Sequence, residues 1–173
     1  MEVRHHTVVT PVGPLLLAVD CLGAVICVHF LEAGEEPAGV LARLGPPRPD
    51  RAATAELERQ LAEYFDGLRH EFELTLAPRG TPFQQTVWAH IQAIGYGRTA
   101  TYGEIATRLG RHTAARAVGG AIAANPIPIV IPCHRVLGDA GSLVGYGAGL
   151  AVKRRLLRLE GVPVPEQASL DLE

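Results

Sequence analysis

The chain of 173 residues combines 47% hydrophobic with 20% charged residues, which is typical of a soluble globular protein with a sizeable core. It holds no run of 18 apolar residues, and its first residues lack the apolar centre of a signal peptide. We therefore expect neither a membrane span nor export. Three cysteines without framework spacing favour a reducing cytoplasm over a disulfide-bonded secreted protein.

The net charge of −2 hides an asymmetry along the chain. Residues 1–81 carry 7 Lys and Arg against 12 Asp and Glu, whereas residues 82–162 carry 9 against 3. Residues 163–173 carry three acids and no base, and we expect them to form a flexible tail. A basic second half indicates binding to a polyanion, although ordinary compositional scatter would give the same asymmetry.

Residues 1–78 are predicted to form a small α/β domain. Apolar or alternating runs bounded by glycine, proline and polar residues predict strands at 3–9, 14–19, 24–31 and 69–76. The first two should form a hairpin. Residues 32–50 hold enough proline and glycine to predict mostly loop. Apolar residues recur at helical spacing from Leu57 to Phe65, with Gly67 just beyond, so a helix should end there.

Residues 79–162 are predicted to form a second, mostly helical domain. Thr81 and Gln84 have the spacing of a capping box, in which each end of the motif satisfies a free backbone N–H at a helix start. Thr101 and Glu104 repeat the pattern. The sequence thus predicts helices that begin at these two points.

The second of these helices and the next one predict a helix-turn-helix. Thr113 should cap the later helix, whose sequence is AARAVGGAIAAN. Its inner face should comprise Ala115, Val118, Gly119 and Ile122. Its outward residues are small except Arg116, whereas a major-groove reader normally presents several long polar side chains. This helix is therefore expected to approach another molecule closely, although many helical hairpins that never contact DNA look alike.

Residues 125–136, NPIPIVIPCHRV, carry the strongest chemical signal. Three prolines forbid a helix and predict extended backbone that ends at Cys133. His134 and Arg135 follow directly, and neighbouring cations or bases lower the pKa of a thiol, which favours the nucleophilic thiolate. A buried structural cysteine is the alternative interpretation.

A last helix is predicted over residues 150–161, after a glycine-rich loop at 138–149. One face of this helix should carry Lys153, Leu156, Leu157 and Glu160. Glu160 lies beside leucines and at the negative end of the helix, where an acid is disfavoured. A residue placed against two such rules indicates a function. A frayed last turn with Glu160 in water is the alternative.

Residues 81–162 resemble the catalytic domain of the O6-alkylguanine-DNA alkyltransferase (methylated-DNA–protein-cysteine methyltransferase) family. The matching segments are TPFQQTVW, GYGRTATYGEIA, AARAVGGAIAANPIPIVIPCHRV, GSLVGYGAGL and KRRLLRLEG. The run IPCHRV is the active-site signature of that family. The first half matches loosely, through TPVGPLLLA. The resemblance implies an RNase H-like α/β domain there, followed by the mostly α domain with its helix-turn-helix.

The resemblance implies direct DNA repair. An alkyl group would move from O6-alkylguanine, and from O4-alkylthymine as well, to Cys133 in one irreversible turnover without a cofactor. His134 would take the thiol proton through a water molecule, and Glu160 would orient His134. Tyr102 would protonate the departing guanine. Asn125 would be the hinge between the DNA-binding helix and the active site.

The implied partner is double-stranded DNA, bound through the minor groove with the damaged base flipped out. Arg116 would fill the gap in the base stack. The DNA-binding residues implied are Arg116, Tyr102, Thr113, Ala115, Gly119 and Arg135. The pocket residues implied are Val136, Val144, Tyr146, Gly147 and Lys153, with the carbonyls of Cys133 and Val136 reading the guanine amine. The protein is expected to act as a monomer, with cooperative binding on DNA left open.

Two positions depart from many relatives. Gly147 stands where some carry serine, so only a backbone N–H could contact the O6 oxygen. Val144 stands where many carry a smaller residue. Both differences bear on which alkyl groups fit.

A zinc site in the first half is a weaker prediction. Some relatives bind zinc in this domain, and Cys21, Cys27 and His29 lie close to His5 and His6 in the sequence. The spacing C-x5-C-x-H is not a recognised ligand pattern, so we expect no metal.

Other functions stay open at this stage. A non-catalytic binder of alkylated DNA would lack the cysteine, and a helix-turn-helix regulator would not need IPCHRV. A cysteine hydrolase built on Cys133, His134 and Glu160 would need an oxyanion hole that the sequence does not reveal.

Overall fold

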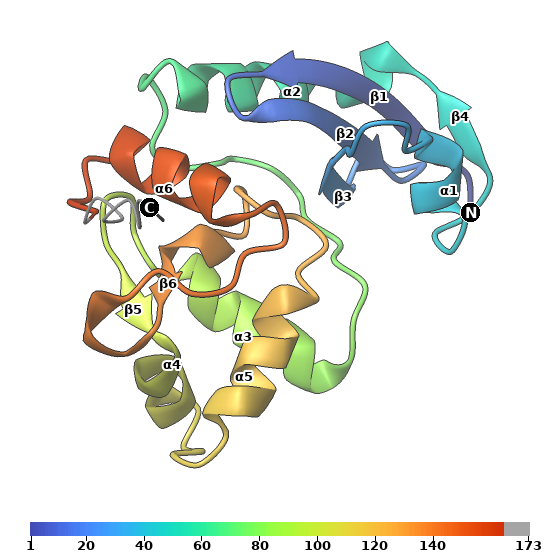
Figure 1. The fold of residues 1–173 in the computed structure, drawn as a ribbon. Coiled ribbons are helices and arrows are strands. Elements are labelled where there is room, and N and C mark those ends of the chain that lie inside the picture. The colour runs from blue at the N-terminus through green and yellow to red at the C-terminus, as the bar shows by residue number, and fades with distance from the viewer. Residues whose placement is uncertain (165–173) are drawn as a thin grey trace, which may run out of the picture.

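The protein is described by a computed structural model over residues 1–164 (Figure 1). Most of the tail expected at 163–173 therefore lies outside the described residues. The first half contains β1 (Val3–Thr10), β2 (Gly13–Val19), β3 (Val25–Phe30), α1 (Pro37–Leu41), β4 (Pro47–Pro49) and α2 (Arg51–Phe65). The second half contains α3 (Pro82–Gln92), β5 (Ala100–Thr101), α4 (Tyr102–Arg108), α5 (Ala115–Ala123), the 3₁₀ turn η1 (Cys133–Arg135), β6 (Val136–Leu137), the 3₁₀ turn η2 (Asp139–Gly141) and α6 (Leu150–Leu159).

The four-stranded sheet has the order β3-β2-β1-β4. Strands β1 and β2 form the predicted antiparallel hairpin, β2 pairs antiparallel with β3, and β4 pairs parallel with β1. Side chains of β2 alternate between two cores, because successive residues of a strand point to opposite faces. Leu15 and Leu17 enter the main core, whereas Leu16 and Ala18 enter a smaller one with Leu41 of α1. Burial on both faces explains the unbroken apolar run.

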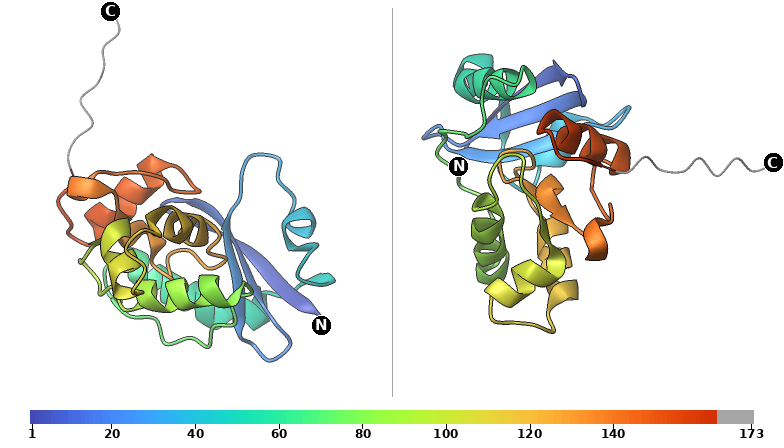
Figure 2. Two further views of the ribbon diagram at one scale, coloured as in Figure 1. Left: turned by 90° about the horizontal axis from the view of Figure 1, so that it is seen from below. Right: turned by 90° about the vertical axis from the view of Figure 1, so that its left-hand side faces the viewer.

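The sheet lies at one end of the molecule, and α3, α4 and α5 gather at the other (Figures 1 and 2). The main core nevertheless runs through both halves and includes Leu17, Leu57, Tyr64, Trp88, Val118, Val136 and Leu156. The edge strand β3 is also tied to the second half, because the Val28 N–H donates to the Pro126 carbonyl at 2.9 Å. This bond brings β3 next to the proline-rich segment that leads to Cys133.

Residues 32–50 are mostly loop, as predicted, and also include the short α1 and the edge strand β4. The strand predicted at 69–76 was wrong. Residues 69–76 form no regular strand, and only one bridge, Leu76 with Val25, joins them to the sheet. The predicted alternation is real, since Phe72 and Leu74 pack partly against the core. A strand also needs a neighbouring strand that pairs with several of its residues, and here only Val25 pairs with this segment.

The helix starts of the second half follow the sequence closely. Both predicted capping boxes are present, at Thr81–Gln84 and at Thr101–Glu104. The prediction for α5 was wrong in two respects. Its N-cap is Ala114, without a side-chain cap, so Thr113 does not cap this helix. Ala115 is exposed rather than inward, and Ala121 takes a place on the buried face.

Trp88 provides a test of how α3 holds α5. Its indole N–H donates to the Ala121 carbonyl at 2.8 Å, in the last turn of α5, where a helix lacks its own donors. Trp88→Phe should lower the free energy of unfolding by about 1–3 kcal/mol, because a buried acceptor loses its donor. Urea denaturation measures the change. Leu22→Ala, at a side chain 90% exposed, is the control and should shift stability by less than about 0.5 kcal/mol.

Candidate active site

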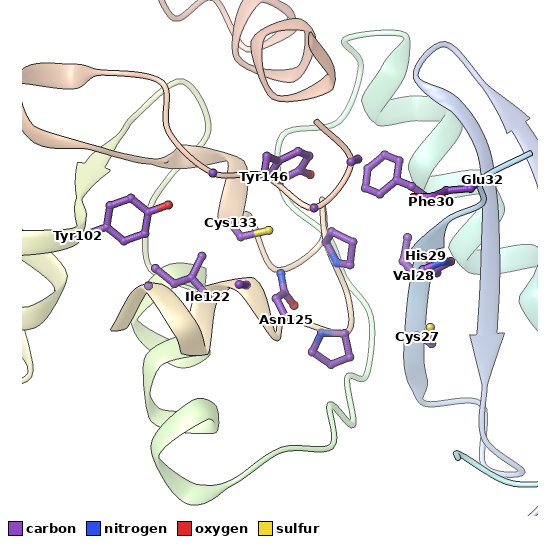
Figure 3. Close-up of a pocket in the computed structure, with 17 residues that line it drawn as sticks. Cys27, Val28, His29, Phe30, Glu32, Tyr102, Ile122, Asn125, Cys133 and Tyr146 are labelled. Carbon is purple, nitrogen blue, oxygen red and sulfur yellow. The ribbon is translucent and has the colours of Figure 1, made fainter. Parts of the chain in front are cut away.

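Cys133 opens onto a cavity of about 520 Å³ between β3 and the second half (Figure 3). The wall on the side of the second half includes Tyr102, Gly119, Asn125, Tyr146 and Gly147. The opposite wall belongs to β3 and the residues after it, and includes Cys27, His29, Phe30 and Glu32. Nothing in the sequence predicted that the first half would line this pocket. The ring of Phe30 meets that of Tyr146 edge to face at 6.0 Å, which closes the cavity on one side.

The loop before Cys133 is held by the side chain of Asn125. Its amide donates to the Ile131 carbonyl at 2.8 Å, and its oxygen accepts from the Ile127 N–H at 3.0 Å. Between these two contacts, Ile129 takes a φ of 74°, which is rare for a β-branched residue. Asn125 therefore fixes a strained loop that delivers Cys133 to the cavity.

The thiol of Cys133 is only 7% exposed. Burial raises its pKa, against lesser lowering effects from the side chain of Asn125 and the charge of Lys153. The expectation that Arg135 would lower this pKa was wrong, because its guanidinium pairs with Glu160. A thiol with a raised pKa stays protonated at neutral pH and needs a base before it can act as a nucleophile.

Glu160 lies at the centre of a buried polar cluster. Its Oε1 accepts from Tyr64 Oη at 2.7 Å, lies 2.7 Å from His134 Nε2, and accepts from Arg135 Nη2 at 3.0 Å. Its Oε2 accepts from Arg135 Nε at 2.9 Å and from the Gly97 N–H at 3.2 Å. Burial alone would raise the pKa of Glu160, but the hydrogen bonds and charges of His134 and Arg135 lower it to about 2. The carboxylate is thus ionised and is no frayed end in water.

His134 is fully buried. Burial lowers its pKa, and Glu160 partly offsets this effect by favouring the imidazolium. The neutral ring, protonated on Nε2, donates to Glu160 and leaves a lone pair on Nδ1. Nδ1 has no hydrogen-bond partner among the described residues. This nitrogen is therefore the atom of the cluster that can accept a proton.

Lys153 is fully buried and links two segments near the pocket. Its Nζ donates to the carbonyls of Val136 at 2.6 Å, Val144 at 2.9 Å and Gly145 at 3.3 Å. Burial lowers the pKa of Lys153 to about 8. The expected pocket residues Val136, Val144 and Lys153 do not line the cavity, whereas Tyr146 and Gly147 do. Val136 is fully buried in β6. Lys153 is also fully buried and holds the backbone of Val144 and Gly145 by hydrogen bonds without lining the cavity itself.

The residues expected to contact DNA fall into two groups. Thr113, Ala115 and Arg116 are exposed at the start of α5, and Gly119 lies one turn further, facing the Tyr102 ring. Arg135 was wrongly expected there, because its side chain is turned inward. Only 5% of this residue is exposed, and its Nη1 donates to the Ile94 carbonyl at 2.5 Å. A side chain held in this way cannot reach a phosphate.

The possible zinc ligands of the first half do not come together. Among residues 1–164, no group of three or more His, Cys, Asp or Glu side chains is placed to hold a metal ion. Cys21 is exposed and Cys27 is buried, and both are free thiols. His29 instead contacts the Glu35 carboxylate at 3.0 Å.

The inward position of Arg135 can be tested by its effect on stability. Arg135→Met should lower the free energy of unfolding by about 3 kcal/mol or more, because a buried carboxylate loses its cation. Arg108→Met, which removes an exposed arginine, is the matched control and should change stability by less than about 0.5 kcal/mol. Chemical denaturation of the two variants measures the difference, and equal stabilities would contradict the buried ion pair.

Comparisons with known proteins show which family this chain is similar to. The family model described as 6-O-methylguanine DNA methyltransferase, DNA binding domain, matches residues 82–162. The methylated-DNA–protein-cysteine methyltransferase of Mycobacterium tuberculosis is 43% identical over 97% of this chain and 98% of its own. That of Methanosarcina acetivorans is 45% identical over 88% and 94%.

A solved structure, Mycobacterium tuberculosis OGT in complex with DNA, superposes with a TM-score of 0.80 at 42% identity and covers 92% of each chain. Sequence, fold and the cysteine-centred site therefore lead to one conclusion: this chain belongs to the methylated-DNA–protein-cysteine methyltransferase family.

Proposed function

We propose that this protein repairs DNA by transferring an alkyl group from O6 of a damaged guanine to Sγ of Cys133. One observation carries the proposal. A buried thiol opens onto a cavity, and the next residue, His134, has a buried Nδ1 free to accept a proton while its Nε2 faces a carboxylate. The relatives described as methylated-DNA–protein-cysteine methyltransferases support the same reaction.

In the proposed reaction, the thiol proton of Cys133 passes through a water molecule to His134 Nδ1. The sulfur then attacks the alkyl carbon, and a new S–C bond forms as the C–O6 bond breaks. The electron pair of that bond stays on the guanine, which takes up a proton from Tyr102. The hydroxyl of Tyr102 is protonated at neutral pH and can donate to the guanine, although burial raises the pKa of Tyr102 and so makes it a weaker acid. The products are a thioether on Cys133 and an unmodified guanine. His134 has gained one proton and Tyr102 has lost one, so exchange with water returns both side chains to their starting states with no net change in protons.

Restoring the thiol would require a thiolate to leave an unactivated alkyl carbon, which is unfavourable. Cys27, the other thiol that lines the cavity, is buried, and burial raises its pKa to about 11, so it is a weak nucleophile at neutral pH. We therefore propose that each molecule acts once. We propose that O4-alkylthymine is a substrate as well. Its alkyl carbon is also bonded to an exocyclic oxygen of an aromatic base, so the same attack by sulfur would release the base.

We further propose that α4 and α5 form a helix-turn-helix that binds double-stranded DNA through the minor groove. Apart from Arg116, the exposed residues of α5 are only alanine and glycine. Gly120 faces open space, since a Cβ added there would meet nothing within 4 Å. Such a surface suits close approach to a duplex. Arg116 projects from it as a long cation beside Thr113 and Ala115. The damaged base would flip out to reach Cys133, because its O6 lies inside the duplex.

The remaining parts of the proposal concern organisation. Residues 1–78 and 79–162 would be the two domains, the first of them RNase H-like, and a monomer would act in the cytoplasm. The order of the sheet and the short linker at Pro78–Gly80 support the division. The continuous main core means that the two domains fold against each other.

Cys133→Ser tests the acceptor. The variant should bind alkylated DNA but show no transfer, because a hydroxyl is a far weaker nucleophile than a thiolate. Duplex DNA with radiolabelled O6-methylguanine and intact-protein mass spectrometry follow the label. The wild type should gain one methyl group per molecule and then stop. A labelled Ser variant would exclude Cys133 as acceptor, and many turnovers per molecule would favour a hydrolase. An unlabelled wild type would indicate a non-catalytic binder or regulator.

Arg116→Ala separates base flipping from chemistry. The rate on duplex DNA at saturating protein should fall by roughly tenfold or more, since flipping costs a few kcal/mol and Arg116 would offset part of it by stacking in the gap. The rate on free O6-benzylguanine, which needs no flipping, should not change. Arg111→Ala, at an exposed arginine outside α5, is the control and should weaken DNA binding without this loss at saturation. Equal saturated rates for Arg116→Ala and wild type would rule out the stacking role.

A further inference from the structure

We infer that Tyr64, in helix α2 of the first half, is a positioning residue that sets how strongly Glu160 holds the proton of His134. The inference rests on the proposed alkyl transfer, in which His134 is the base. It gives the first half a direct part in the chemistry of Cys133.

The contacts of the Tyr64 hydroxyl are specific. Its Oη donates to Glu160 Oε1 at 2.7 Å and lies 3.5 Å from His134 Nε2. Tyr64 is fully buried, so water cannot replace this donor. Its ring is packed between aromatic neighbours, with centroid distances of 5.4 Å to Phe65, 5.5 Å to Phe72 and 6.2 Å to Tyr96. The hydroxyl is therefore held against the carboxylate in one direction.

The Tyr64 hydroxyl affects the pKa of His134 because both groups contact the same oxygen, Glu160 Oε1. Tyr64 and Arg135 both donate to Glu160 Oε1, the same atom that His134 Nε2 contacts. Each donor stabilises negative charge on that oxygen and so weakens its hold on the imidazolium. Without the Tyr64 hydroxyl, Glu160 would stabilise protonated His134 more strongly, and the pKa of His134 would rise. The hydroxyl thus keeps His134 neutral and able to accept the thiol proton.

Other titratable and charged groups also surround His134 and Glu160. They are Arg135 of η1, Tyr96 of the loop after α3, Lys153 of α6, Cys133 of η1 and Tyr146 of the pocket loop. Among these, only Arg135 shares Glu160 Oε1 through a hydrogen bond. Tyr96 belongs to the same aromatic group as Tyr64, but its hydroxyl donates to the Leu159 carbonyl at 3.1 Å. It is the matched control.

Tyr64→Phe and Tyr96→Phe should be compared with wild type in single-turnover transfer from O6-methylguanine duplex DNA across pH 5 to 9. Tyr64→Phe should move the acid limb of the rate profile to higher pH by roughly half to one unit, a three- to tenfold loss of rate on that limb. The plateau at high pH should change by less than roughly threefold, because a stronger base partly compensates for looser positioning. Tyr96→Phe should leave the acid limb in place.

A purely structural role gives a different result. It lowers the rate equally at every pH and leaves the acid limb unmoved, and this outcome would overturn the inference. A wild type that transfers no methyl group would instead overturn the proposed function. The rate at which iodoacetamide labels Cys133, read by peptide mass spectrometry at each pH, supplies a profile that needs no DNA. It should shift in the same direction for Tyr64→Phe.

The wild-type protein offers a second measurement that does not depend on folding of the variant. A buried hydroxyl proton held by a carboxylate exchanges slowly with water, so NMR should detect the Tyr64 hydroxyl proton with a nuclear Overhauser effect to the His134 ring. Its absence under conditions where other buried hydroxyl protons are seen would overturn the inference.

Discussion

The ionised carboxylate of Glu160, buried with only 5% of the residue exposed, is the constraint on which the site depends. A buried charge is tolerated only when a partner and hydrogen bonds satisfy it. The five contacts to its two oxygens come from α2, η1 and the loop before β5. These segments must therefore meet at the end of α6. The requirement explains why the first half packs closely against the second, since Tyr64 supplies a contact that no residue of the second half provides.

The arrangement also explains why His134 and Arg135, the two basic residues after Cys133, have different roles. Arg135 neutralises Glu160, so its charge is not available to the thiol. His134 contacts the same carboxylate through Nε2 and keeps Nδ1 free. Lys153 is the cation whose charge does act on Cys133, and it also holds the carbonyls of Val144 and Gly145 beside the pocket. Lys153 therefore both lowers the pKa of Cys133 through its charge and fixes the position of the loop at Val144 and Gly145 beside the pocket.

The sequence predicted best what short-range chemistry determines. The capping boxes at Thr81 and Thr101 need residues only three positions apart, and both are present. The inward direction of Arg135 depends on a carboxylate 25 positions away, and the role inferred for Tyr64 on one 96 positions away. In the sequence, Tyr64 is one more apolar position in the helix that ends near Phe65. The irregular path of residues 69–76 also depends on distant residues. Alternation of polar and apolar residues predicts a buried and an exposed side, but it does not show whether a neighbouring strand is available for pairing, and here only Val25 of β3 pairs with this segment.

Burial of Cys133 has a further consequence if each molecule reacts once, as proposed. Cys133 is only 7% exposed and its thiol has a raised pKa, so it reacts slowly with small electrophiles and oxidants, because the thiolate is the form that reacts with them. Cys21, at the turn before β3, is exposed and lacks the protection that burial provides. The proposed reaction supplies what the resting thiol lacks, since a flipped base places its alkyl carbon in the cavity next to Sγ and within reach of the proton path through His134. Proximity then provides the rate that nucleophilicity alone would not. In this arrangement, the burial that makes Cys133 slow to react in the free protein also favours its reaction with a base held in the cavity.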